Sequence, residues 1–334
     1  MIRSISRSGL VWPLATLLAI LVYNAFVNPT FFAVEMKNGQ LYGSVIDICF
    51  RATPLILVAL GMTLVIATSG VDLSVGAVAA LSASSAALGF AQGLGWEGAL
   101  ALALGVGLVV GSLNALLIAG FGLQPIVASL IAMVAGRGVA QLLVDGQIAT
   151  LSDPSYLWIG TGGAFGLPFS LWLALIMIVV LALLTRKTSA GLFVEAVGSN
   201  ATASRYIGLS VSRVKWFVYA LAGLMAALSG VVMSANIRAV DVNNLGLFLE
   251  LDAILAVVIG GTRLTGGRFT LLGSALGALI IQTVATTINT QGVAVELMLM
   301  VKAAVVIAIC LAQSDRLRIR VRKARLQPEM KAAS

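Results

Sequence analysis

Long, uninterrupted apolar runs follow one another along the chain, separated by short polar or glycine-rich stretches. Most have about 20 residues, the length that an α-helix needs to cross a bilayer. The runs are continuous, whereas the strands of a membrane barrel alternate apolar and polar positions. Because lipid offers the backbone no hydrogen-bond partner, the pattern predicts an all-α integral membrane protein with about ten transmembrane helices. The predicted spans are residues 10–27, 46–67, 73–91, 98–119, 125–144, 168–185, 214–237, 251–261, 270–289 and 293–312.

Two of these runs depart from the common pattern. The eighth is short, starts beside Glu250 and Asp252, and ends in the glycine-rich stretch 260–267, which together predict a tilted or broken helix. The first follows Arg3 and Arg7, as the apolar part of a signal peptide would. No small-residue cleavage site comes after it, so we expect a retained helix.

Composition supports the membrane class. Hydrophobic residues make up 60% of the chain and charged residues only 10%, whereas soluble domains carry about 25% charged residues. The absence of histidine removes histidine-based catalysis and the commonest metal ligand. Cys49 and Cys310 lie at opposite membrane faces in the predicted topology, which argues against a disulfide. We therefore expect neither an enzyme nor a metal site.

The basic residues predict the orientation. With the N-terminus in the cytoplasm and ten spans, most of the 21 basic residues fall on the inner side, as the positive-inside rule requires. These are Arg3, Arg7, Arg186, Lys187, Arg205, Arg213, Lys215, Arg263, Arg268, Arg316, Arg318, Arg320, Arg322, Lys323, Arg325 and Lys331. The outer side is richer in acids, namely Glu35, Asp47, Glu97, Asp145, Asp153, Asp241, Glu250, Asp252 and Glu296. We expect both termini in the cytoplasm.

This orientation also divides the chain and explains its charge. Residues 1–315 form the predicted transmembrane domain, and residues 316–334 form a basic cytoplasmic tail. The net charge of +8 follows from the topology. The tail from Arg316 to Arg325 can contact the anionic headgroups of the lipid bilayer, although a stop-transfer anchor explains its charge as well, and no nucleic acid is expected.

The chain contains no phosphate-binding loop of the form Gly-x-x-x-x-Gly-Lys-Ser/Thr. The glycine-rich stretch 260–267 lacks the Lys-Ser/Thr pair and no strand precedes it, so it is interpreted as a tight turn between spans. If the protein uses ATP, another chain must hydrolyse it.

The longest inner loop, residues 186–213, is rich in small residues. Ala201, Ala203 and Ser204 are compatible with a short helix. Asn200 would be its N-cap, and Gly208 would lie past its end. Such a helix can enter a groove of a partner closely, although an ordinary connecting loop explains the composition as well.

Glycines recur four residues apart in two spans. Gly107 and Gly111 form one such pair, and Gly273 and Gly277 form the other. Small residues at this spacing permit close approach of helix backbones in membranes, so both pairs predict helix packing.

Four long motifs resemble those of the permeases in the ribose/galactose class of bacterial ABC sugar importers. The motifs are residues 61–76 (GMTLVIATSGVDLSVG), Gln124-Pro125 through Arg137-Gly138 to Asp145-Gly146, Glu195-Ala196-x-Gly198-x-Asn200-x-x-Ala203-x-x-x-x-Gly208, and residues 249–262 (LELDAILAVVIGGT) followed by Leu264-x-Gly266-Gly267. The resemblance covers about residues 45–312. Residues 39–44, 186–188 and 235–238, followed by Asn243-Asn244, are similar to the galactofuranose-type branch. The family's usual double glycine before Val71-Asp72 is Ser69-Gly70 here.

The resemblance implies a permease subunit of the bacterial inner membrane that moves a monosaccharide. In such importers two permeases, either two copies or one with a sister permease, form the path. Cytoplasmic ATP-binding subunits dock beneath them, and a periplasmic sugar-binding protein delivers the sugar. ATP is then used by the partner ATPase, and this chain binds no cofactor. Carried onto this sequence, the ATPase contact consists of Glu195, Ala196, Gly198, Asn200, Ala203, Arg205 and Gly208.

Polar residues in or beside the spans are candidates for lining the path, namely Asp72, Ser74, Asn114, Arg137, Gln282 and Asn289. The break at Gly70 suits a transporter pathway, although a tight turn with Asp72 or Ser69 capping the next helix explains it too. The amides either join helices or meet sugar hydroxyls. Arg137 and Lys302 lie within spans, so each needs a partner there.

Two other functions remain open from the residues alone. An ion-coupled secondary transporter of a small polar solute would use membrane-buried acids, and Asp72 is the one candidate away from the outer edge. An integral membrane enzyme would need a surface cluster of acids, histidine or cysteine, which the chain lacks.

Overall fold

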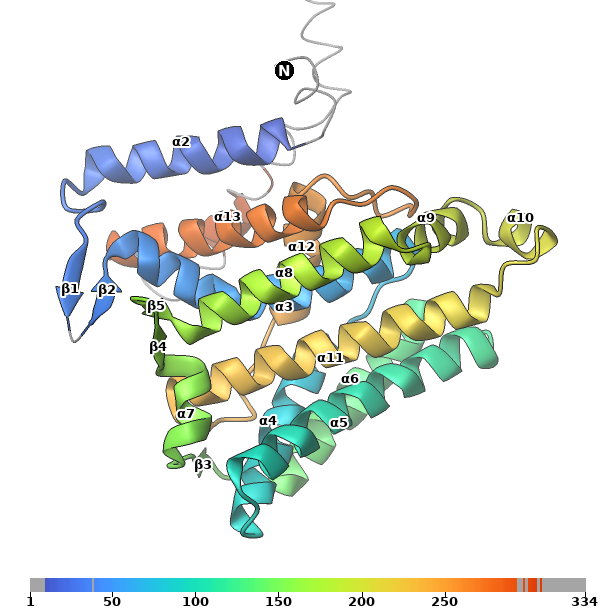
Figure 1. Ribbon diagram of the computed structural model, residues 1–334, viewed down its shortest axis with the longest axis horizontal. Coiled ribbons are helices and arrows are strands. Elements are labelled where there is room, and N and C mark those ends of the chain that lie inside the picture. The colour runs from blue at the N-terminus through green and yellow to red at the C-terminus, as the bar shows by residue number, and fades with distance from the viewer. Residues whose placement is uncertain (1–9, 38, 293–296, 298–299, 305–306, 308–334) are drawn as a thin grey trace, which may run out of the picture.

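Every predicted span up to residue 289 is helical in the computed structural model (Figure 1), which describes residues 10–37, 39–292, 297, 300–304 and 307. The corresponding helices are α2 (Val11–Val27), α3 (Ser44–Ala67), α4 (Val75–Ala91), α5 (Trp96–Ala115) with its π-helical continuation η1 (Leu116–Gly120), α6 (Pro125–Leu143), α8 (Phe169–Lys187), α11 (Val211–Ile237), α12 (Leu249–Ile259) and α13 (Leu271–Thr290). The tenth predicted span, 293–312, and the tail 316–334 fall largely or wholly outside the described residues.

Within the described residues, six helices are long and apolar enough to cross a membrane. They are Ser44–Ala67, Trp96–Gly120, Pro125–Leu143, Phe169–Lys187, Val211–Ile237 and Leu271–Thr290. The helices α2 and α4 have 17 residues each and α12 has 11. The fold is therefore that of a helical membrane protein, and α2, α4 and α12 are the predicted spans that fall short of the usual spanning length.

The centre of the bundle is formed by α3 and α11. The most apolar window of α3 is 83% buried and that of α11 is 72% buried, against 22% for α6 and 17% for α8. The helices α4 and α5 pack against α11 on one side, and α13 packs against α3 on the other. The exposed apolar faces of α6 and α8 are those expected of surfaces that contact lipid or another membrane subunit.

Small residues allow the closest helix contacts, as the glycine spacing predicts. A Cβ atom at Gly111 would overlap the carbonyl oxygen of Tyr219 on α11, and one at Gly107 would overlap Ala227. In the same way, a Cβ atom at Gly277 would overlap the backbone of α12. Both predicted packing sites are confirmed.

Six short strands lie at one end of the molecule, which we call the hairpin end. Strands β1 (Glu35–Lys37) and β2 (Gln40–Tyr42) pair, as do β4 (Gly163–Ala164) and β5 (Leu167–Pro168), and β3 (Ala149–Thr150) pairs with β6 (Ala239–Val240). All three pairs are antiparallel. The sequence did not predict them, nor the short helix α7 (Pro154–Thr161) beside them. The all-α description therefore holds for the spans and not for this end.

The opposite end carries two short helices, α9 (Ala190–Ser199) and α10 (Ala201–Tyr206), and we call it the α10 end. The turn between α12 and α13 reaches the same end (Figure 1). Gly261, Gly266 and Gly267 all have positive φ there, so the glycine-rich stretch is a turn, as predicted.

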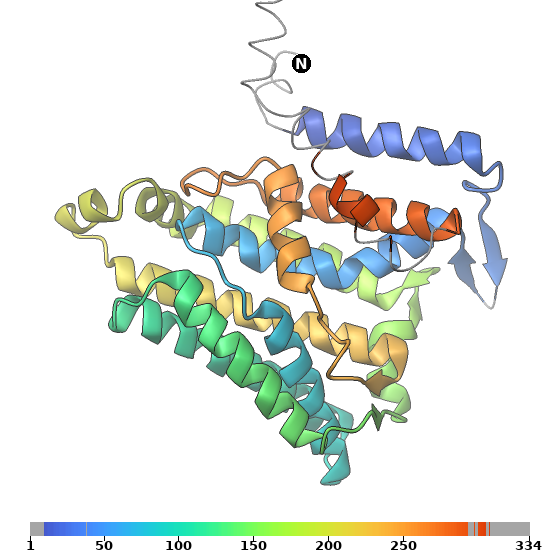
Figure 2. The same cartoon turned by 180° about the vertical axis from the view of Figure 1, so that it is seen from behind.

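Two helices begin inside the bundle instead of at a membrane face (Figure 2). An extended segment leads from the end of α3 into α4, and residues 238–248 lead from α11 back to the start of α12. Figure 2 also shows α12 crossing the neighbouring helices steeply, which agrees with the predicted tilt. These two discontinuities place backbone and polar side chains in the middle of the molecule.

Candidate functional site

A buried chain of hydrogen bonds holds the segment that precedes α4. The Asn114 side-chain amide of α5 donates to Ser74 Oγ at 2.8 Å, and Ser74 Oγ donates to Asp72 Oδ1 at 2.6 Å. The backbone N–H of Ser74 also donates to Asp72 Oδ1, at 2.9 Å. All three side chains are buried. Asp72 thus forms a turn before α4, which was one of the two alternatives for this break. The capping role given to Asp72 or Ser69 in that alternative is wrong, because no side chain caps α4.

The start of α4 crosses the start of α12 at very short range. A Cβ atom at Gly76 would overlap both the carbonyl oxygen of Gly246 and the Glu250 carboxylate. Gly246 has φ +71° and its own Cβ position is filled by Gly76. Only glycine fits at either position, so the two discontinuous helices meet backbone to backbone.

Arg137 of α6 binds the segment that leads into α12. Its Nη1 donates to the carbonyl oxygens of Val242 and Leu245, each at 2.7 Å. The Glu250 carboxylate attracts the guanidinium electrostatically. A charged side chain inside a membrane needs such partners, and both alternatives for Arg137, structural pairing and pathway lining, are compatible with this geometry.

The six pathway candidates do not all meet. Asp72, Ser74, Asn114 and Arg137 lie around the starts of α4 and α12, whereas Gln282 and Asn289 lie on α13. Gln282 bonds Thr286 of its own helix at 3.4 Å. The prediction that Lys302 needs a partner is confirmed, because its Nζ lies 2.5 Å from the Asp252 carboxylate of α12.

The predicted short helix of the central loop is confirmed as α10. The Asn200 side chain accepts a hydrogen bond from Ala203 N at 2.9 Å, which caps the helix at its start. Gly208 follows the end with φ +86°, and the bonds from Gly208 N to Arg205 O and from Leu209 N to Ser204 O form a Schellman motif. The preceding helix, α9, was not predicted.

The helix α9 is seated on the end of α3 at Gly198. A Cβ atom there would overlap the carbonyl oxygen of Ala67, and Gly267 N donates to that same oxygen at 2.9 Å. Ser69 Oγ lies 2.9 Å from Gly198 O and 2.8 Å from Thr265 O. Three of the four sequence motifs therefore meet at this junction. The sequence held one signal for this residue: Ser69 stands where the resembling permeases have the first glycine of a pair. A glycine there indicates positive φ, and Ser69 has φ +60°.

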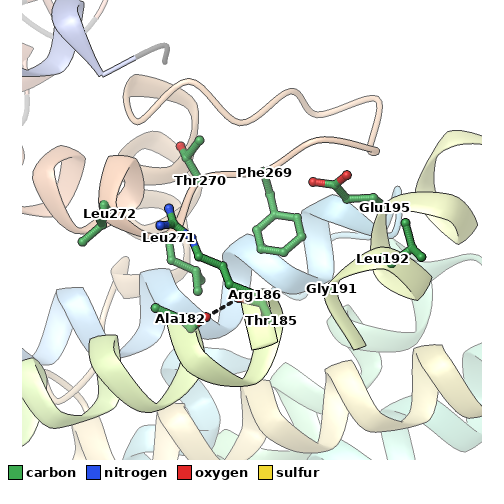
Figure 3. Close-up of a pocket in the computed structure, with 10 residues that line it drawn as sticks. All are labelled: Ala182, Thr185, Arg186, Gly191, Leu192, Glu195, Phe269, Thr270, Leu271 and Leu272. Atoms are coloured by element: carbon green, nitrogen blue, oxygen red, sulfur yellow. Dashed lines mark hydrogen bonds between the residues drawn. The ribbon is translucent and has the colours of Figure 1, made fainter. Parts of the chain in front are cut away.

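The solvent-exposed surface of the α10 end is unusually apolar for a loop region. Tyr206 is 88% exposed, Ile207 76% and Leu192 67%. A cavity of about 260 Å³ lies between α8, α9 and the start of α13, and Leu192 and Glu195 are among its lining residues. In Figure 3 the Arg186 side chain extends toward Leu271, away from Glu195. Such a surface suits contact with a partner protein.

Comparison with known protein families identifies the family of this chain. Residues 44–310 match the family described as "Branched-chain amino acid transport system / permease component". The chain belongs to this permease family.

Several relatives of the permease have assigned substrates. It is 47% identical over 310 residues to the galactofuranose transporter permease protein YtfT of Escherichia coli, covering 91% of each chain. It is 37% identical to the fructose import permease protein FruF of Bifidobacterium longum, covering 95% of this chain and 90% of that protein. The ribose import permease protein RbsC of Escherichia coli is 32% identical, with coverage of 90% and 93%.

These findings identify the permease as a multi-pass inner-membrane subunit of an ABC importer. Its relatives are transport subunits and not enzymes. The arrangement of the site agrees with that role, since it offers buried hydroxyl, amide and backbone groups at two discontinuous helices and an exposed apolar surface at one end.

Proposed function

We propose that the permease imports a monosaccharide, and that its substrate is galactofuranose or a related pentose or hexose. The relatives named for galactofuranose, fructose and ribose support a sugar, in contrast to the amino acids of the family description. The buried polar groups around α4 are chiefly hydroxyls and amides, which suit a neutral solute with many hydroxyls. No comparison supports the alternative of an ion-coupled secondary transporter.

The proposed orientation puts the α10 end in the cytoplasm, with ten spans and both termini inside. The described basic residues of that end are Arg186, Lys187, Arg205, Arg213, Lys215, Arg263 and Arg268, against Lys37, Arg51 and Arg238 at the hairpin end. The hairpin end also carries the acids Glu35, Asp47, Glu97, Asp145, Asp153 and Asp241. This asymmetry supports the positive-inside assignment. In this proposal residues 1–315 form the membrane domain and residues 316–334 the cytoplasmic tail.

The coupling loop, residues 186–213, is proposed as the contact for a separate cytoplasmic ATP-binding subunit. Its exposed side chains Leu192, Tyr206 and Ile207 support a protein partner. Because Gly198 packs directly against the end of α3, movements of the loop would be transmitted to the bundle. ATP would be bound and used by that subunit, and this chain would hold no cofactor of its own.

A second permease, either another copy or a sister chain, is proposed to cover α6. That helix packs mainly on α4, and its exposed surface includes Gln141 as well as apolar residues. Arg137 is only partly buried on the same helix. Polar groups facing lipid are costly, so a partner subunit and a shared path explain this face better than bilayer does. The periplasmic sugar-binding protein would dock at the hairpin end.

The observation that carries the proposal is the tight seat of Gly198, and it sets the test. The full importer is reconstituted in proteoliposomes with its ATP-binding subunit and sugar-binding protein. Uptake of radiolabelled galactose, fructose and ribose is measured together with ATP hydrolysis. We expect Gly198→Trp to insert normally and to hydrolyse ATP with little import, because the bulky side chain lifts α9 from α3.

The control is Gly105→Trp on α5, where nothing lies within 4 Å of the added Cβ position. This variant should import at the rate of the unmodified chain. Unaltered import by Gly198→Trp would remove the loop from the mechanism. Import that continues with an inactive ATP-binding subunit would overturn the proposal as a whole.

A further inference from the structure

Residues 238–248, between α11 and α12, are strained at both ends. Arg238 ends α11 with φ +60°, and Phe248 precedes α12 with φ +61°. Neither residue is glycine, and a side chain in the left-handed region crowds its own backbone. Strain of this kind persists only where surrounding contacts impose it. The contacts that hold the segment therefore identify what keeps it in place.

Two side chains of α6 hold the segment from outside. Arg137 donates to the carbonyl oxygens of Val242 and Leu245, both at 2.7 Å. One helical turn later, Gln141 Nε2 donates to Asn243 Oδ1 at 3.1 Å. The guanidinium makes the stronger contacts because it is charged. Arg137 thus makes two of these three hydrogen bonds, and both are charge-assisted.

The segment also keeps its own shape. Asp241 accepts hydrogen bonds from the Asn244 side chain at 2.7 Å and from Asn243 N at 3.1 Å. These bonds, with that of Asn244 first, hold the pKa of the Asp241 carboxyl below its usual value. Leu245 N donates to Asp241 O at 2.8 Å. The first residues are fixed to the fold, because Ala239 and Val240 pair with β3 and Leu151 N donates to Arg238 O at 2.9 Å. Residues 241–248 are bonded internally and are the part that can move as a unit.

The place of the segment gives this movement a consequence. Gly246 packs against Gly76 at the start of α4, and Leu247 and Phe248 are half exposed. Figure 2 shows the segment on the same face as α6, α12 and the start of α4. We propose that residues 241–248 form a gate over the discontinuous helices, and that Arg137 is the positioning residue that latches it. The assignment of this gate to a sugar path rests on the proposed function.

The test measures opening of the segment directly. Val242 is 4% exposed, so a cysteine there reacts slowly with a maleimide while the gate is latched. The background is the full chain with Cys49→Ser and Cys310→Ser, in lipid nanodiscs that leave both faces accessible. Val242→Cys is combined with Arg137→Met, Arg137→Lys or Gln141→Leu. Arg137→Met should raise the labelling rate about tenfold or more, because two charge-assisted hydrogen bonds are lost.

The remaining variants should change the labelling rate of Val242→Cys by smaller amounts. Arg137→Lys keeps the charge without the reach of the guanidinium and should fall between the two extremes. Gln141→Leu should raise labelling only about threefold, since it removes one neutral hydrogen bond. Arg51→Met is the matched control, because Arg51 pairs with Asp47 at an exposed position of α3 and should leave labelling unchanged.

A second reporter separates gate opening from general loosening. Ser229 of α11 is fully buried away from the segment, so Ser229→Cys should remain unreactive in every variant. Unchanged labelling of Val242→Cys in Arg137→Met would overturn the latch. A parallel rise at Ser229→Cys would also overturn it, by showing that Arg137 only supports the fold. The assay needs no sugar, ATP or partner, so its failure is distinct from failure of the proposed function.

Discussion

Ser69 Oγ lies 2.9 Å from the carbonyl oxygen of Gly198, and this contact joins segments 129 residues apart in the sequence. The same hydroxyl lies 2.8 Å from the carbonyl oxygen of Thr265. Its single hydrogen is thus shared between α9 and the turn that precedes α13. Ser69 makes both contacts from the left-handed region, with φ +60°. The residue therefore combines backbone strain with a bond that offsets it.

This combination predicts different effects for two substitutions. Ser69→Ala removes the bond and keeps the strain, so it should lower the free energy of unfolding by about 1 kcal/mol. Ser69→Gly also removes the bond but relieves the left-handed strain, and it should be close to neutral. Thermal unfolding of the purified permease in detergent measures both. Thr68→Val is the control, since the Thr68 hydroxyl bonds Val65 O of α3 at 2.8 Å, and neither α9 nor the turn before α13 accepts it among the described residues. An alanine variant as stable as the glycine variant would contradict the account.

The cap of α10 predicts a local effect. Asn200→Ala should cost about 1 kcal/mol of helix stability, because Ala203 N then loses its acceptor. Hydrogen–deuterium exchange of residues 201–209 should accelerate about fivefold, with the spans unaffected. Asn200→Asp keeps an acceptor and should retain slow exchange. Equal acceleration in both variants would show that the side chain does not act as a cap.

Local signals in the sequence were enough to predict the helices of the apolar runs up to residue 289, and α10. Continuous apolar runs leave the chain few alternatives in lipid, and Asn200 with Gly208 marks the two ends of one short helix. The helix α9 carried a signal that was missed. Its buried residues Gly191, Val194, Val197 and Gly198 recur at helical spacing. The loop was rich enough in small residues to hide this pattern.

The contacts that assemble the site were beyond a single sequence. Arg137 and Val242 are 105 residues apart in the sequence, and no local pattern near either residue indicates that they are in contact. The short strands depend on similar long-range bonds, such as that from Leu41 N to Gly166 O at 2.8 Å. The pathway candidates were chosen because they are polar. This choice placed Gln282 and Asn289 of α13 in one set with Asp72, Ser74, Asn114 and Arg137, which lie on other elements. Polarity identifies candidates, but only the packing shows which of them meet.

The contact between α5 and α11 predicts a steep cost for one added methyl group. Gly111→Ala should destabilise the permease by about 1–3 kcal/mol, because its Cβ atom would overlap Tyr219 O. Gly105→Ala on the same helix has open space and should be neutral or slightly stabilising. Thermal unfolding of the two purified variants makes the comparison. Equal stability of both would mean that the helices separate easily at this point.

The ion pair between Asp252 and Lys302 allows a double-mutant test of how membrane charges are stabilised. The two side chains are only 25% and 17% exposed, and each would lack its partner if the other were removed. Lys302→Met alone or Asp252→Leu alone should therefore lower the free energy of unfolding, by about 1–2 kcal/mol after allowance for partial exposure.

The double variant should recover most of that loss, since apolar residues of similar volume replace an ion pair at little cost. Unfolding of the four proteins in detergent completes the cycle. Losses that simply add in the double variant would show that the two charges act independently. Recovery would instead show that the pair exists because each charge needs the other, and that α12, with only 11 residues, is anchored through it.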